Sequence, residues 1–151
     1  MNISETTDIS KIKRVLCDPE IYGRITDDGS PSIEEFEPVK PCREVYYLTD
    51  ENNVGLVFLH WINSVTLVGH VQILKDGRAK AMEFGKEALN WIWENTPAQK
   101  ITVTIPELYP DVERFVIKQG FQLEGVSKKS HLKNGKLYDQ SYLGLSRYLW
   151  V

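Results

Sequence analysis

The sequence predicts a mixed α/β fold in which helices cover both faces of a single β-sheet. The apolar run from Val65 to Leu74 is rich in β-branched and large residues, which is typical of a central, buried strand. A polar turn follows, and from Ala79 to Thr96 apolar residues recur at helical spacing. The next segment, 101–105, alternates between apolar and polar residues as a strand does. Because a helix connects them, the two strands are expected to lie parallel in the sheet.

Composition places the chain among soluble proteins with one domain. It has 151 residues, of which 42% are hydrophobic and 26% are charged, and these values are ordinary for a globular domain. The formal net charge of −3 gives no electrostatic basis for binding nucleic acid. No apolar run is long enough to span a membrane, and the first residues lack a signal-peptide pattern. We therefore expect a cytoplasmic protein with no nucleic-acid or membrane partner.

The two cysteines predict neither a disulfide framework nor a metal site. Cys17 and Cys42 are the only cysteines, and neither has a second cysteine or a histidine nearby in the sequence. Free thiols in a reducing compartment are the simplest interpretation. We expect no bound metal ion.

The N-terminal region predicts a helix followed by a long irregular segment. Asp8 can cap a helix over residues 8–17, which Asp18-Pro19 either ends or restarts. Residues 21–41 contain several glycines and prolines and an acidic cluster, with room for a short helix at 32–36. A loop of this length serves either as a pocket lid or as a surface connection, and both interpretations stay open.

The remaining elements complete the sheet. Segments 44–49 and 55–62 read as strands that form an antiparallel meander with the central strand. Residues 111–119 read as a short helix, and Gly120 suits the left-handed position after its C-terminus. A further strand begins at Phe121.

A hairpin is predicted near the C-terminus. Asn134-Gly135 is a strong signal for a two-residue type I′ turn between strands 127–133 and 136–143. The register that follows pairs Lys133 with Lys136, Leu132 with Leu137, His131 with Tyr138, and Ser130 with Asp139. The pair of His131 and Tyr138 is either a catalytic or substrate-orienting pair or a stacked pair that faces solvent.

The turn after the central strand has the chemistry of a phosphate site. A helix that begins directly after a strand presents free backbone N–H groups and the positive end of its dipole at the sheet edge. Lys75, Arg78 and Lys80 add positive charge at the same place. The alternative interpretation is an ordinary turn with solvated basic side chains.

Three pieces of the sequence together resemble those of a known protein family. The matching pieces are GHVQIL with KDGRAKAMEFGKEALNWIWENTP, then KQGFQLEGV, then KNGKLYDQSYLGLSR, and they cover the chain from the central strand to the end. Together they resemble the GNAT superfamily of acetyl-CoA-dependent N-acetyltransferases, and above all its small phage-encoded members. The resemblance implies a mostly antiparallel sheet of six to seven strands. It also implies that 1–151 is one GNAT-like domain, with an acceptor-side segment (8–43), a cofactor-binding core (44–105) and a C-terminal helix and hairpin (106–151).

The resemblance also implies where acetyl-CoA would bind. In the superfamily the central strand diverges from its parallel neighbour, and the pantetheine arm pairs with the exposed strand edge. On this chain, backbone groups of Gln72, Ile73 and Leu74 would hold the arm. The loop that binds the pyrophosphate falls on Arg78, Ala79, Lys80 and Ala81. The loop departs from the family pattern at Ala81, where a glycine is usual, and at Glu83, which brings a negative side chain toward a polyanion.

Three residues are candidates for catalysis. His70 occupies the position on the central strand where phage relatives often carry a histidine, and the resemblance implies that it acts as general base. The alternative is a structural histidine within the sheet. The family's usual acid, a tyrosine four residues before the glycine of the Gly-Phe pair, is replaced by Val116. Tyr109 has the nearest hydroxyl that could replace this acid. The alternative is that Tyr109 is a structural tyrosine of the core or the rim. Tyr138 is the third candidate, through the hairpin.

Two functional classes follow from this reading. In the first, the chain transfers the acetyl group of acetyl-CoA to a primary amine of a small molecule or protein, and the acidic residues Asp27, Asp28 and 34–37 attract a cationic acceptor. In the second, the fold is kept without catalysis, and the protein acts in phage virion assembly or host interaction. The apolar tail 148–151 is expected either to fold back on the sheet or to contact a partner, including a second copy.

Overall fold

The computed structural model describes residues 1–149 and contains one seven-stranded sheet, in the order β1-β2-β3-β4-β5-β7-β6. Only the β4–β5 pair is parallel. The strands are β1 (Ile3–Glu5), β2 (Val45–Asp50), β3 (Gly55–Trp61), β4 (Thr66–Ile73), β5 (Lys100–Pro106), β6 (Gln122–Lys133) and β7 (Lys136–Ser146). The helices are α1 (Ile9–Leu16), α2 (Pro19–Ile25), α3 (Ala81–Asn95) and α4 (Pro110–Lys118), with 3₁₀ turns η1 (Lys75–Lys80) and η2 (Arg147–Leu149). The predicted mixed, mostly antiparallel sheet is confirmed.

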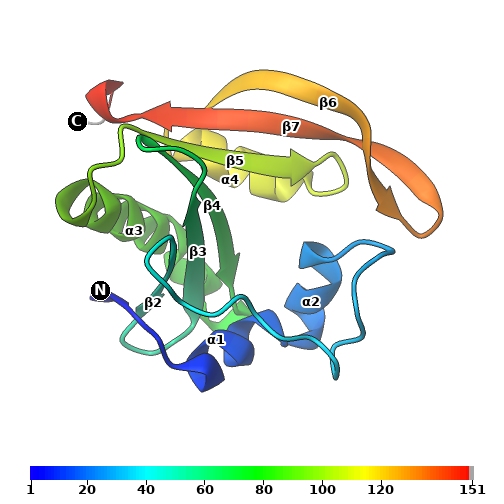
Figure 1. Cartoon of the computed structure of the whole chain (residues 1–151), viewed down its shortest axis with the longest axis horizontal. Helices are drawn as coiled ribbons and strands as arrows, with labels where there is room; N and C mark the ends of the chain where they lie inside the picture. The colour runs from blue at the N-terminus through cyan, green and yellow to red at the C-terminus, as the bar shows by residue number, and fades with distance from the viewer. Residues whose placement is uncertain (150–151) are drawn as a thin grey trace.

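Two apolar cores lie on opposite faces of the sheet (Figure 1). The larger core joins α3 and α4 to one face, with Phe84 and Ile92 of α3 among its buried side chains. The smaller core joins α1 and α2 to the other face, around Ile12 and Tyr47. Burial of these helix faces is the main force that fixes the layers.

The N-terminal region contains more regular structure than its sequence predicts. Asp8 caps α1 as expected, because its carboxylate accepts a hydrogen bond from the Ser10 N–H at 2.9 Å. Asp18 caps α2 in the same way, so Asp18-Pro19 restarts the helix. The prediction that the irregular segment begins at residue 21 is therefore wrong as far as Ile25. The short helix expected at 32–36 is absent, and a turn occupies that stretch.

Strand β1 has no counterpart in the prediction. It is three residues long, and Ile3 is its only side chain packed on the larger core. Its hydrogen-bonding partner is β2, with Ile3 opposite Asp50. A three-residue edge strand forms because β2 pairs with it, and its own sequence is too short to show the alternation of a strand.

The C-terminal hairpin has the predicted turn and, near its tip, the predicted register. Asn134 and Gly135 both have positive φ, 52° and 76°, as a type I′ turn requires. The predicted pairs that include His131–Tyr138 are formed. The pair Ser130–Asp139 is wrong, because a bulge between Ser127 and His131 shifts the strand. Asp139 instead accepts a hydrogen bond from the Lys129 N–H at 2.9 Å.

The hairpin tip is bonded to the segment after α2. The Asp28 carboxylate accepts hydrogen bonds from the N–H groups of Asn134 and Gly135, at 2.7 and 2.8 Å. The Lys133 ammonium donates to the carbonyls of Gly23 and Thr26, at 2.6 and 2.8 Å. We call this set of contacts the hairpin latch. It gives the Asp28 carboxylate two hydrogen-bond donors within the chain.

The chain end packs against the C-terminus of α3. The Arg147 guanidinium donates to the carbonyls of Trp93, Thr96 and Ala98, at 2.6, 3.3 and 3.1 Å, so it satisfies groups that the helix end leaves free. Beyond it, Tyr148 is 83% exposed. The rest of the predicted apolar tail, 150–151, lies outside the described residues.

Candidate active site

The candidate site begins where β4 and β5 separate. The two strands pair at three positions only, Thr66–Lys100, Leu67–Ile101 and Val68–Thr102. Strand β4 continues beside β3 as far as Ile73, while β5 turns away toward β7 (Figure 1). From Gly69 onward, therefore, one edge of β4 has no strand partner within the described chain.

The alternation of the ladder identifies which backbone groups face this free edge. The Leu74 N–H donates to the Val54 carbonyl at 2.7 Å, so even-numbered residues of β4 direct their backbone groups to β3. The odd-numbered residues Gly69, Val71 and Ile73 direct theirs to the free edge. Among the three residues predicted to hold a pantetheine arm, Ile73 faces the free edge, whereas Gln72 and Leu74 face β3.

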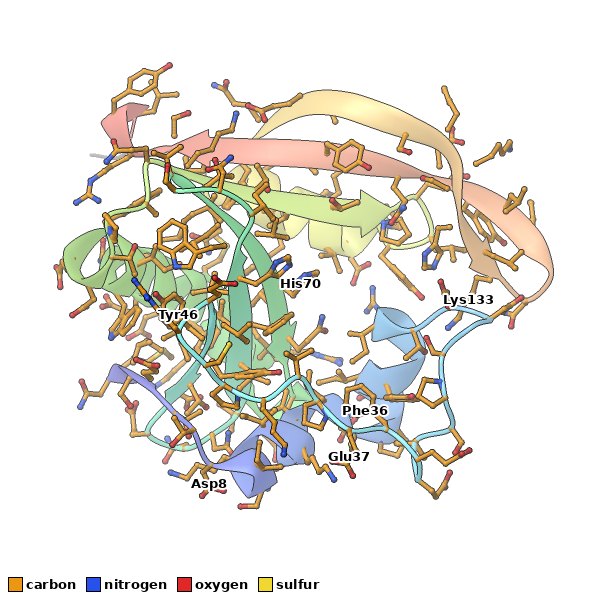
Figure 2. All side chains as sticks on the ribbon, in the orientation of Figure 1. Asp8, Phe36, Glu37, Tyr46, His70 and Lys133 are labelled. Carbon is orange, nitrogen blue, oxygen red and sulfur yellow. The ribbon has the colours of Figure 1, made fainter. Side chains whose placement is uncertain are left out.

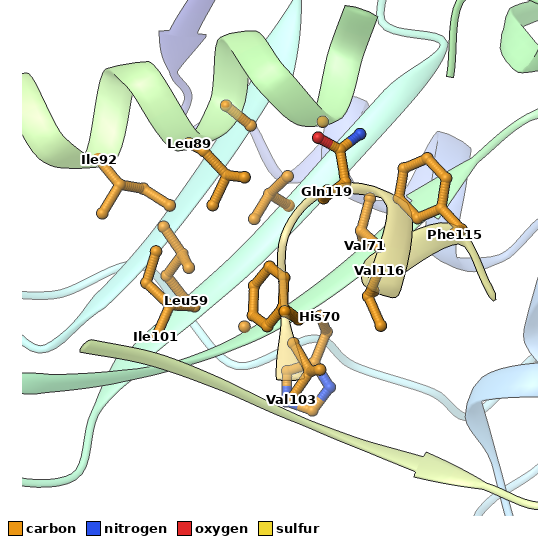
Figure 3. A pocket seen from close by; sticks show the side chains of 15 residues that line it. Leu59, His70, Val71, Leu89, Ile92, Ile101, Val103, Phe115, Val116 and Gln119 are labelled. Atoms are coloured by element: carbon orange, nitrogen blue, oxygen red, sulfur yellow. The ribbon is translucent and has the colours of Figure 1, made fainter. Parts of the chain in front are cut away.

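An apolar cavity of about 60 Å³ lies beside the free edge, between the sheet, α3 and α4. Figure 3 shows Leu89 and Ile92 of α3 on one side and Val116 and Gln119 on the other. Gln119 and His70 are the polar residues in the lining, and the Gln119 amide donates to the Met82 carbonyl at 3.1 Å. Val116, at the position of the family's usual acid, lines the same cavity and brings no proton to it.

The start of α3 presents backbone N–H groups without side-chain caps. Neither η1 nor α3 receives a side-chain hydrogen bond at its N-terminal end. Lys75, Arg78 and Lys80 are exposed around this end, as are Ala79 and, partly, Ala81. The Arg78 guanidinium lies 3.5 Å from the Glu20 carboxylate of α2. The segment is a 3₁₀ turn, in which the Gly77 N–H bonds to the Leu74 carbonyl at 2.8 Å.

Glu83 does not block this helix end. Its carboxylate lies 3.5 Å from the amino group of Met1, which is its ion-pair partner. The negative charge that the sequence brings toward the loop is thus paired beside β1. The site keeps an excess of positive side chains for an anionic ligand.

His70 also borders the cavity (Figure 3) and lies near the middle of the molecule (Figure 2). Its ring stacks on Phe58, its cross-strand partner on β3, with 5.4 Å between ring centroids, and on His60 at 5.9 Å. The side chain is exposed on its open side, yet burial of the rest of the ring, with His60 as a second cause, lowers the pKa of His70 to about 4. The imidazole is therefore neutral at physiological pH.

Tyr109 lies at the start of α4, away from these groups. Its hydroxyl donates to the Gly23 carbonyl at 3.4 Å, and the Arg24 guanidinium lies 4.7 Å from its ring centroid. Burial raises the pKa of Tyr109, and the charge of Arg24 opposes that shift. Among the described residues no hydrogen bond or ring contact joins it to His70. These contacts are those of the rim tyrosine that the sequence left as an alternative.

Tyr138 lies in the hairpin opposite His131, with the Lys136 ammonium 5.1 Å from its ring centroid. Within residues 1–149 it shares no hydrogen bond or ring contact with His70 either. The His131 Nε2 atom is buried and has no hydrogen-bond partner in the structure. The three catalytic candidates of the sequence thus occupy three separate places.

Sequence reasoning did not identify three residues of this region, namely Phe58, His60 and Gln119. The alternating pair Phe58-x-His60 on a predicted strand beside His70 was a usable signal, because adjacent strands bring such residues together. Gln119 gave no local signal, since its role depends on the packing of α4 against α3.

The described residues form neither a metal site nor a membrane-spanning helix. In the described part of the chain, no group of three or more His, Cys, Asp and Glu side chains is arranged to hold a metal ion. None of the helices between residues 1 and 149 is both long and apolar enough to cross a membrane.

Comparison with known proteins identifies the fold. No protein-family model matches the sequence, and no curated protein matches it either. Spermidine N-acetyltransferase from Vibrio cholerae, crystallised with CoA and spermine, superposes with a TM-score of 0.75 at 17% identity, over 97% of this chain and 96% of that one. A chimera of that enzyme with hSSAT gives 0.76 at 18% identity, over 98% and 97%. The protein smu.2055 from Streptococcus mutans gives 0.72 at 16% identity, over 97% and 99%. The chain therefore has the GNAT fold along nearly its whole length.

Proposed function

We propose that this protein is an N-acetyltransferase that transfers the acetyl group of acetyl-CoA to a primary amine. The observation that carries the proposal is the free edge of β4, which lies between the uncapped start of α3 and His70. A diphosphate at the helix start and an amide-containing arm along the edge would place a thioester near the divergence of the strands. The likeness to N-acetyltransferases supports the same ligand.

The chain's own residues have distinct parts in this proposal. Backbone groups of Gly69, Val71 and Ile73 bind the arm, and Arg78 and Lys80 with the amides at the start of α3 bind the diphosphate. The apolar cavity excludes water from the thioester side of the edge. In this proposal, the segment 44–105 binds acetyl-CoA, and the segment 8–43 of the same domain lies on the side of the amine acceptor.

His70 orients the amine in this scheme. A primary ammonium has no lone pair, so the acceptor first loses one proton to water. The neutral imidazole then accepts a hydrogen bond from the resulting amine, whose nitrogen attacks the thioester carbon; the C–N bond forms, and the C–S bond breaks. With a pKa of about 4, His70 is too weak a base to hold the amine proton, so it passes that proton to water. Val116 has no proton to give, so the departing thiolate takes its proton from water.

Calorimetric titration with CoA and acetyl-CoA tests the donor site. Micromolar binding is expected, and Arg78→Ala should weaken it by about tenfold, because it removes a charge-assisted contact to a phosphate. Glu20→Gln is the matched control, since it removes only the partner of Arg78 and should leave the affinity equal or higher. No heat of binding at millimolar CoA would contradict the proposal.

A binding role without catalysis is the second candidate. Val116 at the position of the usual acid favours it, as does the exposed Tyr148 near the chain end, which offers a surface to a phage or host protein. The discriminating result is turnover. Release of free CoA from acetyl-CoA that depends on an added amine identifies the enzyme, whereas tight CoA binding without such release identifies the binding role.

A further inference from the structure

A row of aromatic rings crosses the face of the sheet that α1 and α2 only partly cover. Tyr47 stacks on Phe58 with 5.0 Å between ring centroids, and Phe58 contacts His60 at 5.5 Å and His70 at 5.4 Å. Tyr47 is buried in the smaller core, Phe58 and His60 are half-buried, and His70 is exposed. The row therefore begins inside the protein and becomes accessible beside the point where β4 leaves β5.

The accessible end of the row is a pair of imidazoles. Burial, with the charge of His60 as a second cause, lowers the pKa of His70 and so disfavours a cation on its ring. The two imidazoles stack with nearly parallel planes, 15° apart. Such a surface binds a flat apolar group better than a chain of charges.

Four acidic residues of the segment after α2 have partners within the chain. Asp28 accepts the two turn amides of the hairpin latch, and Asp27 accepts the Gly29 N–H at 2.9 Å. Glu35 accepts the Ser32 hydroxyl at 2.8 Å, and Glu37 pairs with Lys13 at 3.0 Å. A ligand with several ammonium groups would compete with Lys13 for Glu37 and with the two turn amides for Asp28.

We propose, building on the acetyltransferase function above, that the acceptor is an arylalkylamine with a single ammonium group, whose ring packs on Phe58, His60 and His70. The short alkyl link then carries the nitrogen from the ring row to the divergence of β4 and β5, where the thioester would lie. His70 serves both parts of the ligand, because its ring face continues the row and its nitrogen accepts a hydrogen bond from the amine. This class differs from the polyamine present in the similar Vibrio structure.

A substrate panel tests the assignment on the unmodified protein. The acetylation rate is followed as CoA release with 2-phenylethylamine, with n-hexylamine as an aliphatic amine of similar length, and with spermidine. We expect kcat/KM for 2-phenylethylamine to exceed that of each of the other two amines by at least tenfold, since ring stacking contributes only to the first.

Two substitutions connect this preference to the ring row. His60→Gln and Phe58→Leu should each lower the ratio of kcat/KM between 2-phenylethylamine and n-hexylamine by about five- to tenfold. Leu123→Ala, on the exposed edge strand β6, is the control and should leave the ratio unchanged. Phe58 packs on the buried Tyr47, so His60→Gln gives the decisive value if Phe58→Leu fails to fold.

The outcomes separate this inference from the function on which it rests. Preference for spermidine, equal rates with the aliphatic amine, or bound acetyl-CoA without turnover of any of the three amines overturns the arylalkylamine assignment and leaves the donor site intact. Absence of acetyl-CoA binding overturns both.

Discussion

At the scale of single residues, His70 shows how neighbours change the chemistry of a predicted site. The sequence assigns it the ordinary pKa of a histidine, which suits a general base near neutral pH. In the structure the ring stacks on Phe58 and His60, and burial, with the charge of His60 as a second cause, lowers that pKa to about 4. His70 is therefore better suited to accept a hydrogen bond than to keep a proton.

The lowered pKa of His70 has a consequence for stability. Unfolded protein binds a proton at His70 below about pH 6.5, whereas folded protein does so only below about pH 4, so the free energy of unfolding should fall as the pH drops between these values. His70→Gln should remove this part of the pH dependence. The measurement is the urea midpoint at pH 7 and pH 5 for both proteins, with pH 7 and pH 8 as a control interval in which they should change alike. An identical loss between pH 7 and pH 5 would contradict the assignment.

Residue-level prediction succeeded where the signal was local. Asn134-Gly135 specified both its turn and the opposition of His131 to Tyr138, because two positive φ angles dictate the register of the adjoining residues. The predicted pairing of Ser130 with Asp139 is wrong, because a bulge shifts the register between Ser127 and His131. Lys129 has a φ of 50° in this bulge, and no glycine or asparagine in the sequence indicates it.

At the scale of elements, β4 contributes two different edges to the molecule. Its even-numbered residues are bonded to β3, and its odd-numbered residues from Gly69 onward face no strand within residues 1–149. The sequence predicted the strand. It could not predict which of Gln72, Ile73 and Leu74 faces the free edge, because that depends on which residues of β4 are hydrogen-bonded to β3. That information comes from the Val54–Leu74 contact and is absent from the strand's own pattern.

This asymmetry predicts opposite effects for two neighbouring proline substitutions. Ile73→Pro removes an N–H that faces the free edge, so folding should persist while the dissociation constant for CoA rises by about tenfold. Gln72→Pro removes an N–H that is bonded to β3 and should unfold or strongly destabilise the domain. Calorimetric titration and circular dichroism measure the two effects. Unfolding of the Ile73→Pro protein together with tolerance of Gln72→Pro would show that the edges are exchanged.

The contact between α3 and α4 offers a second test at this scale. A Cβ on Gly85 would overlap the Gln119 amide, so Gly85→Ala should destabilise the fold by about 1–3 kcal/mol in spite of the better helix propensity of alanine. The double substitution Gly85→Ala/Gln119→Ala removes the overlap and should recover part of that loss. Urea unfolding of the two proteins and of Gln119→Ala measures the coupling. Additive effects would mean that the two side chains do not compete for space.

At the scale of the whole molecule, sequence predicted the architecture better than the site. Apolar periodicity specified the strands, helices and layers, because burying those faces is the same requirement that folds the chain. The acidic segment was interpreted from charge alone, and the structure uses Asp28 to hold the hairpin tip. Contacts between distant segments decide which side chains remain available, and composition does not encode them.

The hairpin latch joins the segment after α2 to the tip of the C-terminal hairpin, and a substitution at Asp28 tests it directly. Asp28→Ala should speed hydrogen exchange at the Asn134 and Gly135 amides, since it removes their acceptor. Asp27→Ala is the control, because Asp27 accepts hydrogen bonds only within its own turn. The two amides also hold the pKa of Asp28 below its usual value, so the latch should weaken as the pH falls below about 4. Unchanged exchange in Asp28→Ala would show that other contacts hold the tip.

The hairpin latch also bears on the order in which the molecule assembles. Asp28 and Asn134 are separated by 106 positions in the chain, so their contact closes a very long loop. The entropy lost in closing such a loop is recovered only when the strands between them are already paired. We therefore expect the two turn amides to gain protection late during refolding, after those of β3 and β4, in a pulse-labelling experiment.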